Sequence, residues 1–299
     1  MIINRLAREM VGMIKADDIV LGYLSCKAQE NRVNLNSYSP AMHDESAMSN
    51  GRINNLGDHL SKIIVDYMCS RRGCDMNAET TLKRHLYAVG SIILMGYQNA
   101  TIWGTGCPYE PSFLRGLPHR KPFRKLDIRC VRGPLTQKTL ENLGHSCPQV
   151  YGDPAVLLPL MYKPLENEID KKRDYVIISH YQTERGVKED IPTDNFLSMN
   201  TTEYKAVIDK ICSAEKVVSS SLHGIILAEA YGVPAVFFQD RPARFNYKYE
   251  DWYASTGREM KIPKIGWKAA LDSEAYKIPE LLEMQTMLIN TFPYDLWED

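Results

Sequence analysis

The sequence predicts an α/β protein made of two successive doubly wound units, each a parallel sheet covered by helices, that face each other across a cleft. Three observations support this prediction. The length of 299 residues suits two domains. Apolar strands alternate with amphipathic helices along most of the chain. One charged stretch, residues 163–173, interrupts the alternation and is the expected linker. We therefore place an N-terminal domain at 1–165 and a C-terminal domain at 172–299.

The elements of the first unit follow from their apolar periodicity. The expected strands are short and apolar, and they cover residues 32–38, 88–94, 101–103 and 127–131. The expected helices cover residues 1–30, 59–68 and 134–143, with a polar loop at 40–54. Asp58 is suited to cap the second helix, and Gly144 ends the third. This alternation is typical of a parallel sheet with helices on both faces.

The second unit repeats the alternation after the charged stretch. Its expected strands are again apolar and cover residues 175–179, 216–219 and 234–238. Its expected helices cover residues 203–214, 222–231 and 279–290. Both units are therefore Rossmann-like, and the carboxyl ends of such strands are where ligands bind.

Charge and cysteine content exclude several classes of protein. The chain has 36 Lys and Arg against 37 Asp and Glu, a net charge of −1, so it lacks the basic excess of a nucleic-acid-binding protein. Its seven cysteines show neither CxxC pairs nor zinc-type spacing and indicate reduced thiols. We expect no metal or bound cofactor. No apolar run suits a signal peptide or a membrane span, so we expect a cytoplasmic protein.

The strongest local feature is the turn Ser219-Ser220-Ser221-Leu222-His223-Gly224, where a buried strand runs into a helix. The free amide N–H groups and the dipole at a helix N-terminus attract an anion such as phosphate or carboxylate. His223 can donate to that anion or relay a proton. Capping by the serines, with His223 packed under a loop, explains the same residues equally well.

A second turn, Asn55-Leu56-Gly57-Asp58, also precedes a helix. Its glycine allows a ligand to approach the backbone, although capping by Asp58 explains the pattern too. The turn Gly104-Thr105-Gly106 resembles a phosphate loop only loosely, because Tyr109 stands where the dinucleotide fingerprint needs a glycine. This argues against a dinucleotide site.

Three further positions carry groups that suit an anionic ligand. Arg132 stands at a strand end, where its guanidinium could bind carboxylate or phosphate, or face solvent. Asp153 follows a strand and points toward the cleft or makes a turn with Pro154. His180 and Tyr181 end the first strand of the second unit, where an open sheet binds ligands, or bond to a neighbouring loop.

Basic and aromatic residues alternate near the end of the second unit. They are Arg241, Arg244, Phe245, Tyr247, Lys248, Tyr249, Trp252, Tyr253 and Arg258. Such residues suit a sugar stacked on a ring or an anion bound to a cation, and they also suit an ordinary amphipathic surface.

In this order the segments resemble the polysaccharide pyruvyl transferase family over residues 52–258. The matching segments are Asn55 to Asp58, Gly104 to Gly106, Val131 to Thr136, Gly152 to Pro159, Ile178 to Tyr181 and Ser219 to Pro234. The resemblance implies a two-lobed GT-B-like fold. It also implies transfer of a pyruvyl group from phosphoenolpyruvate, the co-substrate, to a sugar of a cell-surface polysaccharide or its lipid-linked precursor, commonly as a ketal, with release of phosphate. A lipid-linked acceptor would bring the protein to the inner membrane face.

The resemblance implies roles for individual residues. Donor contacts fall to the C-terminal domain and Arg132, namely Arg132, Ser220, Ser221, Leu222, His223, Gly224, Arg244 and Lys248. Acceptor contacts fall to Asn55, Gly57, Asp58, His180 and Tyr181, and the catalytic residues are expected among His223, Asp58 and Asp153. Many members carry arginine where this chain has Ser221, so one phosphate contact is either lost or supplied by Arg241, Arg244 or Lys248.

Two other functions share this pattern. A GT-B glycosyltransferase would use a nucleotide-sugar donor instead of phosphoenolpyruvate. An inactive sugar-binding relative in a polysaccharide assembly is the second alternative, and the departure at Ser221 is the feature that favours it.

Overall fold

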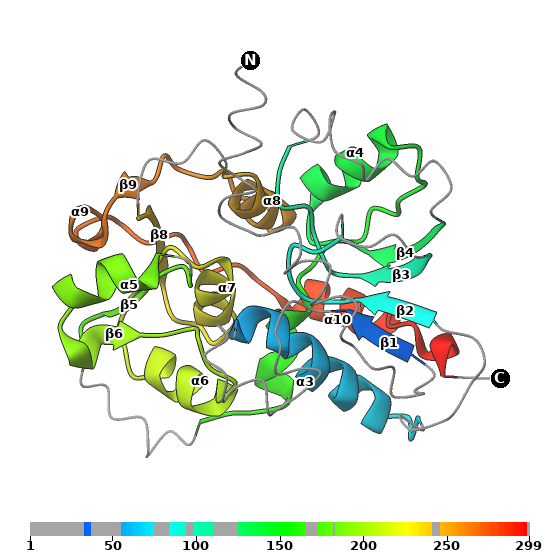
Figure 1. The fold of residues 1–299 in the computed structure, drawn as a ribbon, viewed down its shortest axis with the longest axis horizontal. Coiled ribbons are helices and arrows are strands. Elements are labelled where there is room, and N and C mark those ends of the chain that lie inside the picture. Colours follow the sequence, from blue (N-terminus) through cyan, green and yellow to red (C-terminus); the bar gives the residue numbers. More distant parts are fainter. Residues whose placement is uncertain are drawn as a thin grey trace.

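The computed structural model describes residues 55–74, 84–93, 99–110, 125–164, 173–181, 183–240 and 246–297, together with the backbone of 33–36. They form an α/β fold with parallel sheets (Figure 1). The helix expected at 1–30, the loop at 40–54, most of the expected linker, and Arg241 and Arg244 lie outside the described residues.

The first sheet has four parallel strands in the order β1-β2-β3-β4. They are β1 (Val33–Asn36), β2 (Arg84–Tyr87), β3 (Ala100–Trp103) and β4 (Leu126–Cys130). The strand expected at 88–94 is wrong: the strand ends at Tyr87, and the chain then turns through Gly90 at φ +107°. Residues 88 and 89 are apolar because they are buried in the core, which is why they resembled a strand.

The helices of the first unit are α3 (Leu56–Ser70) and α4 (Pro134–Asn142), followed by the 3-10 helix η4 (Pro154–Leu160). Helix α3 starts three residues before the predicted position, so Asn55 occupies the N-cap position and Asp58 lies in the first turn. The capping role considered for Asp58 is therefore wrong. Its carboxylate instead accepts a 2.8 Å hydrogen bond from Asn55 Nδ2.

The second sheet has five parallel strands in the order β6-β5-β7-β8-β9. They are β5 (Val176–Ile178), β6 (Phe196–Leu197), β7 (Val217–Ser219), β8 (Ala235–Gln239) and β9 (Lys264–Ile265). The helices around it are α5 (Glu184–Val187), α6 (Tyr204–Cys212), α7 (Leu222–Ala230), α8 (Tyr247–Ser255), α9 (Trp267–Leu271) and α10 (Leu282–Asn290), with short 3-10 helices η5 (Lys188–Asp190), η6 (Thr193–Asn195) and η7 (Tyr294–Leu296).

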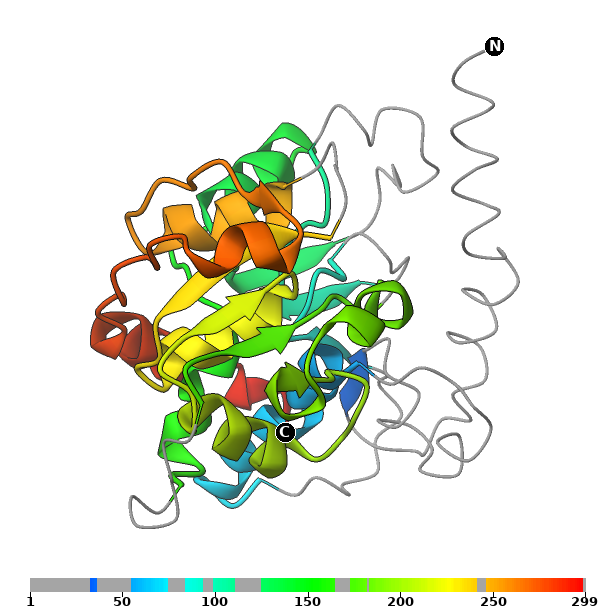
Figure 2. The ribbon, with the colours of Figure 1, turned by 90° about the vertical axis from the view of Figure 1, so that its left-hand side faces the viewer.

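Helices cover both faces of the second sheet, as the sequence predicts (Figure 2). Neighbouring residues of a strand point to opposite faces. Ile178 accordingly packs in the core shared with α6 and α7, whereas Ile177 packs with Ala270 of α9. Strands buried on both faces read as continuous apolar runs, which made them recognisable in the sequence.

The two units share one hydrophobic core. The cluster that contains Trp103 of β3 also contains Ile225 of α7. The C-terminal helix α10 contacts the first sheet, since Trp103 Nε1 donates a 3.0 Å hydrogen bond to the carbonyl of Leu288 and its ring meets Phe292 edge-on. The expected domain boundary stays a prediction, as does an open cleft between two lobes.

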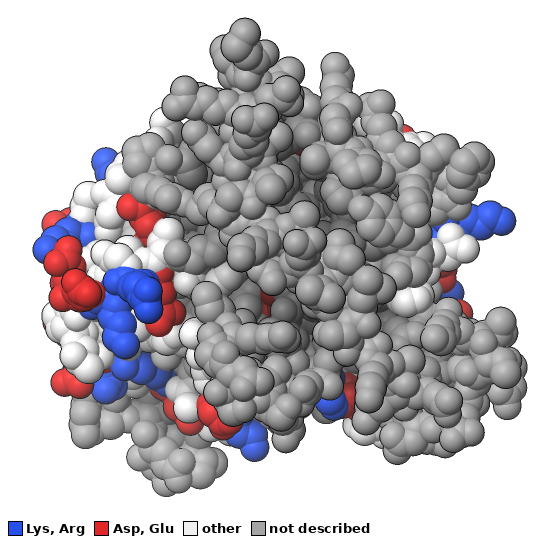
Figure 3. Space-filling model, viewed as in Figure 1, with Lys and Arg blue, Asp and Glu red and all other residues white. Residues whose placement is uncertain are grey.

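Acidic and basic side chains are interspersed over the described surface of the second unit (Figure 3).

Candidate functional site

Four turns that are far apart in sequence meet at the carboxyl ends of the strands. Helix α3 contributes Asp58, the start of η4 contributes Asp153, the start of α7 contributes His223, and α8 contributes Lys248. Asp58 interacts electrostatically with the other three. The structure therefore brings the three expected catalytic residues and Lys248, which was expected to bind the donor substrate, into a single cluster.

His223 lies between α3 and η4. Its Nε2 is 3.7 Å from Asp153 Oδ2, and its ring packs directly on Gly57. A Cβ atom at position 57 would lie 1.9 Å from His223 Nδ1, so only glycine leaves room for this ring. His223 is 7% exposed, and its Nε2 has no hydrogen-bond partner. A buried polar atom without a partner is costly and indicates a functional position.

The serines of the same turn have structural partners. Ser221 is the N-cap of α7 and accepts the Gly224 N–H at 3.4 Å, while Ser219 Oγ accepts the Ser221 N–H at 3.0 Å. Gly224 packs against Ser219 Oγ so closely that a Cβ would come within 2.5 Å. The capping explanation therefore holds for Ser219 and Ser221, and Leu222 is buried. Packing under a loop does not account for the unpartnered nitrogen of His223.

Asp153 combines the two roles considered for it. Its Oδ1 accepts the Ala155 N–H at 3.0 Å and caps η4, whereas its Oδ2 has no hydrogen bond and faces His223. The carboxylate is completely buried. One oxygen is thus fixed by the backbone, and the other is directed at the imidazole.

Asp58 is an acid with an altered proton affinity. Its pKa is raised from 3.8 to about 6, mainly by burial and to a smaller extent by nearby Asp153. His223, the 2.8 Å hydrogen bond from Asn55 Nδ2 and Lys248 oppose this rise. Gly90 lies close enough that a Cβ there would be 2.6 Å from Asp58 Oδ1. Acids with raised pKa values in such clusters are candidates for proton transfer.

Replacing Asp58 with asparagine is expected to stabilise the protein at neutral pH. A folded pKa raised from 3.8 to about 6 means that ionising Asp58 opposes folding, by up to about 3 kcal/mol above pH 6. The gain in unfolding free energy of Asp58→Asn should therefore be full at pH 7.5 and shrink as the pH falls toward 4. Urea unfolding at both pH values measures it. Asp66→Asn, an exposed acid on the same helix, is the control, and an equal gain there would contradict the assignment.

Lys248 supplies the positive charge of the cluster. Its half-buried ammonium has a pKa lowered to about 8 by burial and by the charge of Arg132, with Asp58 acting in the opposite direction. Lys248 Nζ lies 3.2 Å from His180 Nε2, and the His180 ring packs on Tyr181 at 4.7 Å between centroids. His180, an expected acceptor-binding residue, thus adjoins Lys248, an expected donor-binding residue.

The order of the second sheet explains why ligand-binding side chains meet here. Strands β5 and β7 are neighbours, but the chain leaves them toward opposite edges, which creates the crevice where doubly wound proteins bind ligands. The backbone N–H of His180, after β5, donates to Ser220 Oγ at 2.8 Å. Ser220 Oγ in turn donates to Asp240 Oδ2 at 2.8 Å.

Arg132 differs from its predicted arrangement. The sequence suggested a guanidinium directed at a ligand or at solvent, but the side chain is 0% exposed. Its Nε lies 3.2 Å from Asp251 Oδ2, Nη1 donates to Ser91 Oγ at 2.7 Å, and Nη2 donates to the Cys107 carbonyl at 2.9 Å. Solvent exposure is therefore wrong for Arg132. Direct contact with a donor would require displacing these partners and stays a prediction.

Sequence reasoning missed Asp251 and Asp240. Asp251 lies inside an aromatic helix without any glycine or spacing signal, and its partners are more than a hundred residues away. Asp240 directly follows β8, and the position at a strand end is the one signal that could have found it.

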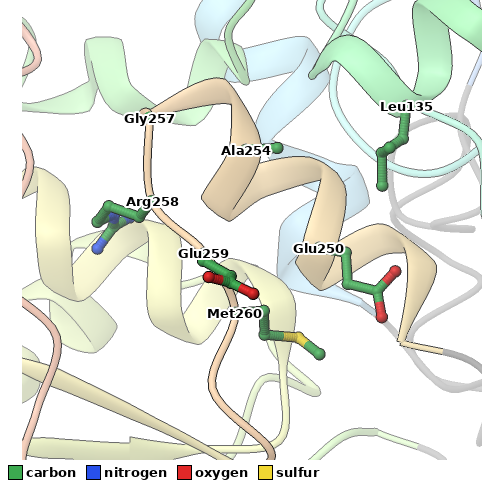
Figure 4. Close-up of a pocket in the computed structure, with 7 residues that line it drawn as sticks. All are labelled: Leu135, Glu250, Ala254, Gly257, Arg258, Glu259 and Met260. Carbon is green, nitrogen blue, oxygen red and sulfur yellow. The ribbon is translucent and has the colours of Figure 1, made fainter.

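The described residues contain no group of three or more His, Cys, Asp or Glu side chains placed to hold a metal ion. Within the same ranges, no helix is long and apolar enough to cross a membrane. An open groove beside α8 encloses about 540 Å³ (Figure 4). It is lined by Leu135, Glu250, Ala254, Gly257, Arg258, Glu259 and Met260, and so contains none of the predicted site residues.

The fold and site define an α/β protein whose polar cluster lies at the carboxyl ends of parallel strands. Residues 99–240 match the family model for polysaccharide pyruvyl transferase, and this match confirms the predicted resemblance. This part of the chain is therefore similar to the polysaccharide pyruvyl transferase family. Asp58 and Lys248, both predicted from the sequence as site residues, lie outside the matched residues.

Two relatives extend the comparison. The chain is 28% identical over 190 residues to the uncharacterized protein L143 of Acanthamoeba polyphaga mimivirus, covering 61% of this chain and 63% of that protein. It is 29% identical over 216 residues to the succinoglycan biosynthesis protein ExoV of Rhizobium meliloti (strain 1021), covering 70% of this chain and 65% of ExoV. The match therefore spans less than two thirds of either relative. A crystal structure of an uncharacterized Klebsiella pneumoniae protein aligns with a TM-score of 0.44 and 13% identity over 80% of this chain and 93% of that one.

Proposed function

We propose that this protein transfers a pyruvyl group from phosphoenolpyruvate to a sugar of a cell-surface polysaccharide or its lipid-linked precursor, forming a ketal and releasing phosphate. The observation that carries the proposal is the cluster in which Asp58 interacts with His223, Asp153 and Lys248, while His223 Nε2 faces Asp153 and has no hydrogen-bond partner. The family match and the similarity to a succinoglycan biosynthesis protein support it.

The charge of the cluster suits a small donor that carries phosphate and carboxylate. Lys248 and the amide groups at the start of α7 supply positive potential beside His223. Arg132 is buried and already paired with Asp251, so we assign it no direct contact with the donor. Lys248 then takes the phosphate contact that many family members obtain from the arginine replaced here by Ser221.

The proposed reaction balances without a metal or redox partner. A proton added to the methylene carbon of phosphoenolpyruvate produces a cation at the central carbon. One sugar hydroxyl attacks that carbon and loses its proton, and the carbon–oxygen bond to phosphate then breaks. A second hydroxyl closes the ketal and loses its proton. Two hydroxyl protons are lost; one balances the proton in the new methyl group, and the other leaves with phosphate.

The residues divide these tasks by position. His223 handles the proton or contacts the phosphate, because its buried Nε2 has no hydrogen-bond partner and faces Asp153. Asp58 and Asp153 orient the acceptor hydroxyls and accept their protons. His180 and Tyr181 offer ring faces to the sugar.

Phosphoenolpyruvate is expected to raise the melting temperature, and nucleotide sugars are not. A ligand at 100 times its dissociation constant stabilises the folded state by about 2.7 kcal/mol. Thermal denaturation with each ligand, followed by a phosphate-release assay with saccharide acceptors, tests the proposal. Stabilisation by a nucleoside diphosphate instead would support a glycosyltransferase, and saccharide binding without phosphate release would support a non-catalytic relative. Either outcome would overturn the proposed reaction.

A further inference from the structure

A carboxylate from α8 occupies the N-terminus of α4. Asp251 is completely buried, and its Oδ1 accepts the amide N–H groups of Leu135 at 2.9 Å and Thr136 at 3.0 Å. Its Oδ2 accepts the Thr136 hydroxyl at 2.7 Å and lies 3.2 Å from Arg132 Nε. The protein therefore supplies its own carboxylate to the Arg132 guanidinium, which the sequence suggested for a ligand, and to the start of α4.

This contact depends on a close approach of the two helices. A Cβ on Gly133 would lie 2.1 Å from the Asp251 carbonyl and 2.5 Å from its Oδ1, so glycine is required there. Thr136 Oγ1 also accepts the Cys107 N–H at 2.9 Å. Through Thr136 and Arg132, one carboxylate connects α8 to the loops that follow β3 and β4.

The same helix carries the cation of the proposed site. Lys248 and Asp251 are one helical turn apart on α8, and Tyr249 between them donates a 2.6 Å hydrogen bond to the Ser220 carbonyl. Helix α8 thus contacts α4 of the first unit and the Ser220 turn of the second (Figure 1). Both contacts, the one with α4 and the one with the Ser220 turn, therefore fix the position of Lys248 on α8.

We propose that Asp251 is a positioning residue, which holds α8 against α4 so that Lys248 lies within the Asp58–His223 cluster and Arg132 stays neutralised beside it. The predicted effect of Asp251 on turnover rests on the proposed function. The predicted effect of Asp251 on the position of Lys248 is independent of that function. The charged or titratable groups that face Lys248 are Asp58 from α3, Arg132 from the turn before α4 and His180 after β5.

The direct test is Asp251→Asn, read out by the reactivity of Lys248. An amine-reactive label applied across pH 6–11, with the labelled peptide quantified by mass spectrometry, reports the midpoint at which the Lys248 ammonium loses its proton. Loss of this anchor should release Lys248 from the buried cluster, and because burial is the main cause of its lowered pKa, the midpoint should move to higher pH. Phosphate release from phosphoenolpyruvate should fall on the order of 100-fold, as expected for a displaced contact group.

A milder pair of variants covers the case in which Asp251→Asn fails to fold. Thr136→Val removes the hydroxyl donor to Asp251 but keeps every charge, and should lower turnover about tenfold, the loss of one charge-assisted hydrogen bond. Thr136→Ser keeps the hydroxyl and should match the wild type. Glu229→Gln is the control for loss of a buried carboxylate that also holds α8, since Glu229 accepts from Trp252 Nε1 at 2.8 Å. It should lower the melting temperature without moving the Lys248 midpoint.

The outcomes separate the two proposals. A midpoint shift in Asp251→Asn, in a protein that never releases phosphate from phosphoenolpyruvate, would support the positioning role and overturn the proposed reaction. An unchanged midpoint together with unchanged turnover would overturn the positioning role. So would an equal shift in Glu229→Gln, because the effect would then follow from lost packing of α8. If Asp251→Asn does not fold, wild-type turnover in Thr136→Val overturns the proposal.

Discussion

Replacing His223 with glutamine is expected to lower the rate of phosphate release by two to four orders of magnitude, the usual contribution of a positioned proton-transfer group. The reason is that His223 Nε2 is a buried nitrogen, 3.7 Å from Asp153 Oδ2 and without a hydrogen bond. Steady-state phosphate release with a saccharide acceptor measures the effect. A fall in kcat alone indicates proton handling, whereas a rise in KM alone indicates phosphate contact.

His223→Gln should lose turnover while its melting temperature changes little. The imidazole contributes no hydrogen bond from Nε2, so its removal is not expected to lower the melting temperature by more than a few degrees. His145→Gln, in the loop after α4, is the matched control and should retain full turnover. Phosphate release by His223→Gln within threefold of the wild type would remove His223 from the chemistry.

Gly57→Ala is expected to disrupt the site from a position that carries no chemistry. The added Cβ would lie 1.9 Å from His223 Nδ1 and 2.5 Å from its Cγ, so the ring or helix α3 must move. We expect a loss of about 1–3 kcal/mol in unfolding free energy, as for overpacking in a core. Turnover should fall at least tenfold, because a displacement of 1 Å can cost 100-fold.

A double-mutant cycle isolates this contact. Alanine is favoured over glycine by about 1 kcal/mol inside a helix. Once His223→Ala has removed the ring, Gly57→Ala should therefore stabilise the protein, so the sign of its effect reverses. Gly186→Ala is the control, because a Cβ at that position would meet nothing within 4 Å. Urea unfolding of the four cycle members measures the coupling. If Gly57→Ala destabilises equally with and without His223, the overlap with the ring is not the cause.

The predicted and observed sites overlap because the end of a buried strand can be recognised from a short stretch of sequence. His180, Ser220 and His223 each follow a buried apolar strand, and Asp153 follows an isolated bridge at Tyr151. Parallel strands present such turns at one edge of a sheet. Arg132 was found by the same rule, but its environment was not. A guanidinium at a strand end has the same sequence signal whether it faces a ligand or a buried carboxylate. Asp251, which decides between the two, lies 119 residues further along the chain.

The sequence by itself determined the α/β class, most of the strands and helices, and the turns that carry Asp58, Asp153 and His223, because apolar periodicity and turn chemistry are local properties. It misplaced the strand near Gly90, since a buried loop and a buried strand have the same composition. Tertiary structure alone decided that Lys248 joins the cluster, that Arg132 is neutralised by Asp251 and that Gly57 supports the His223 ring. These contacts join residues that the chain separates widely, and the burial that raises the pKa of Asp58 and lowers that of Lys248 exists only after the two units have packed together.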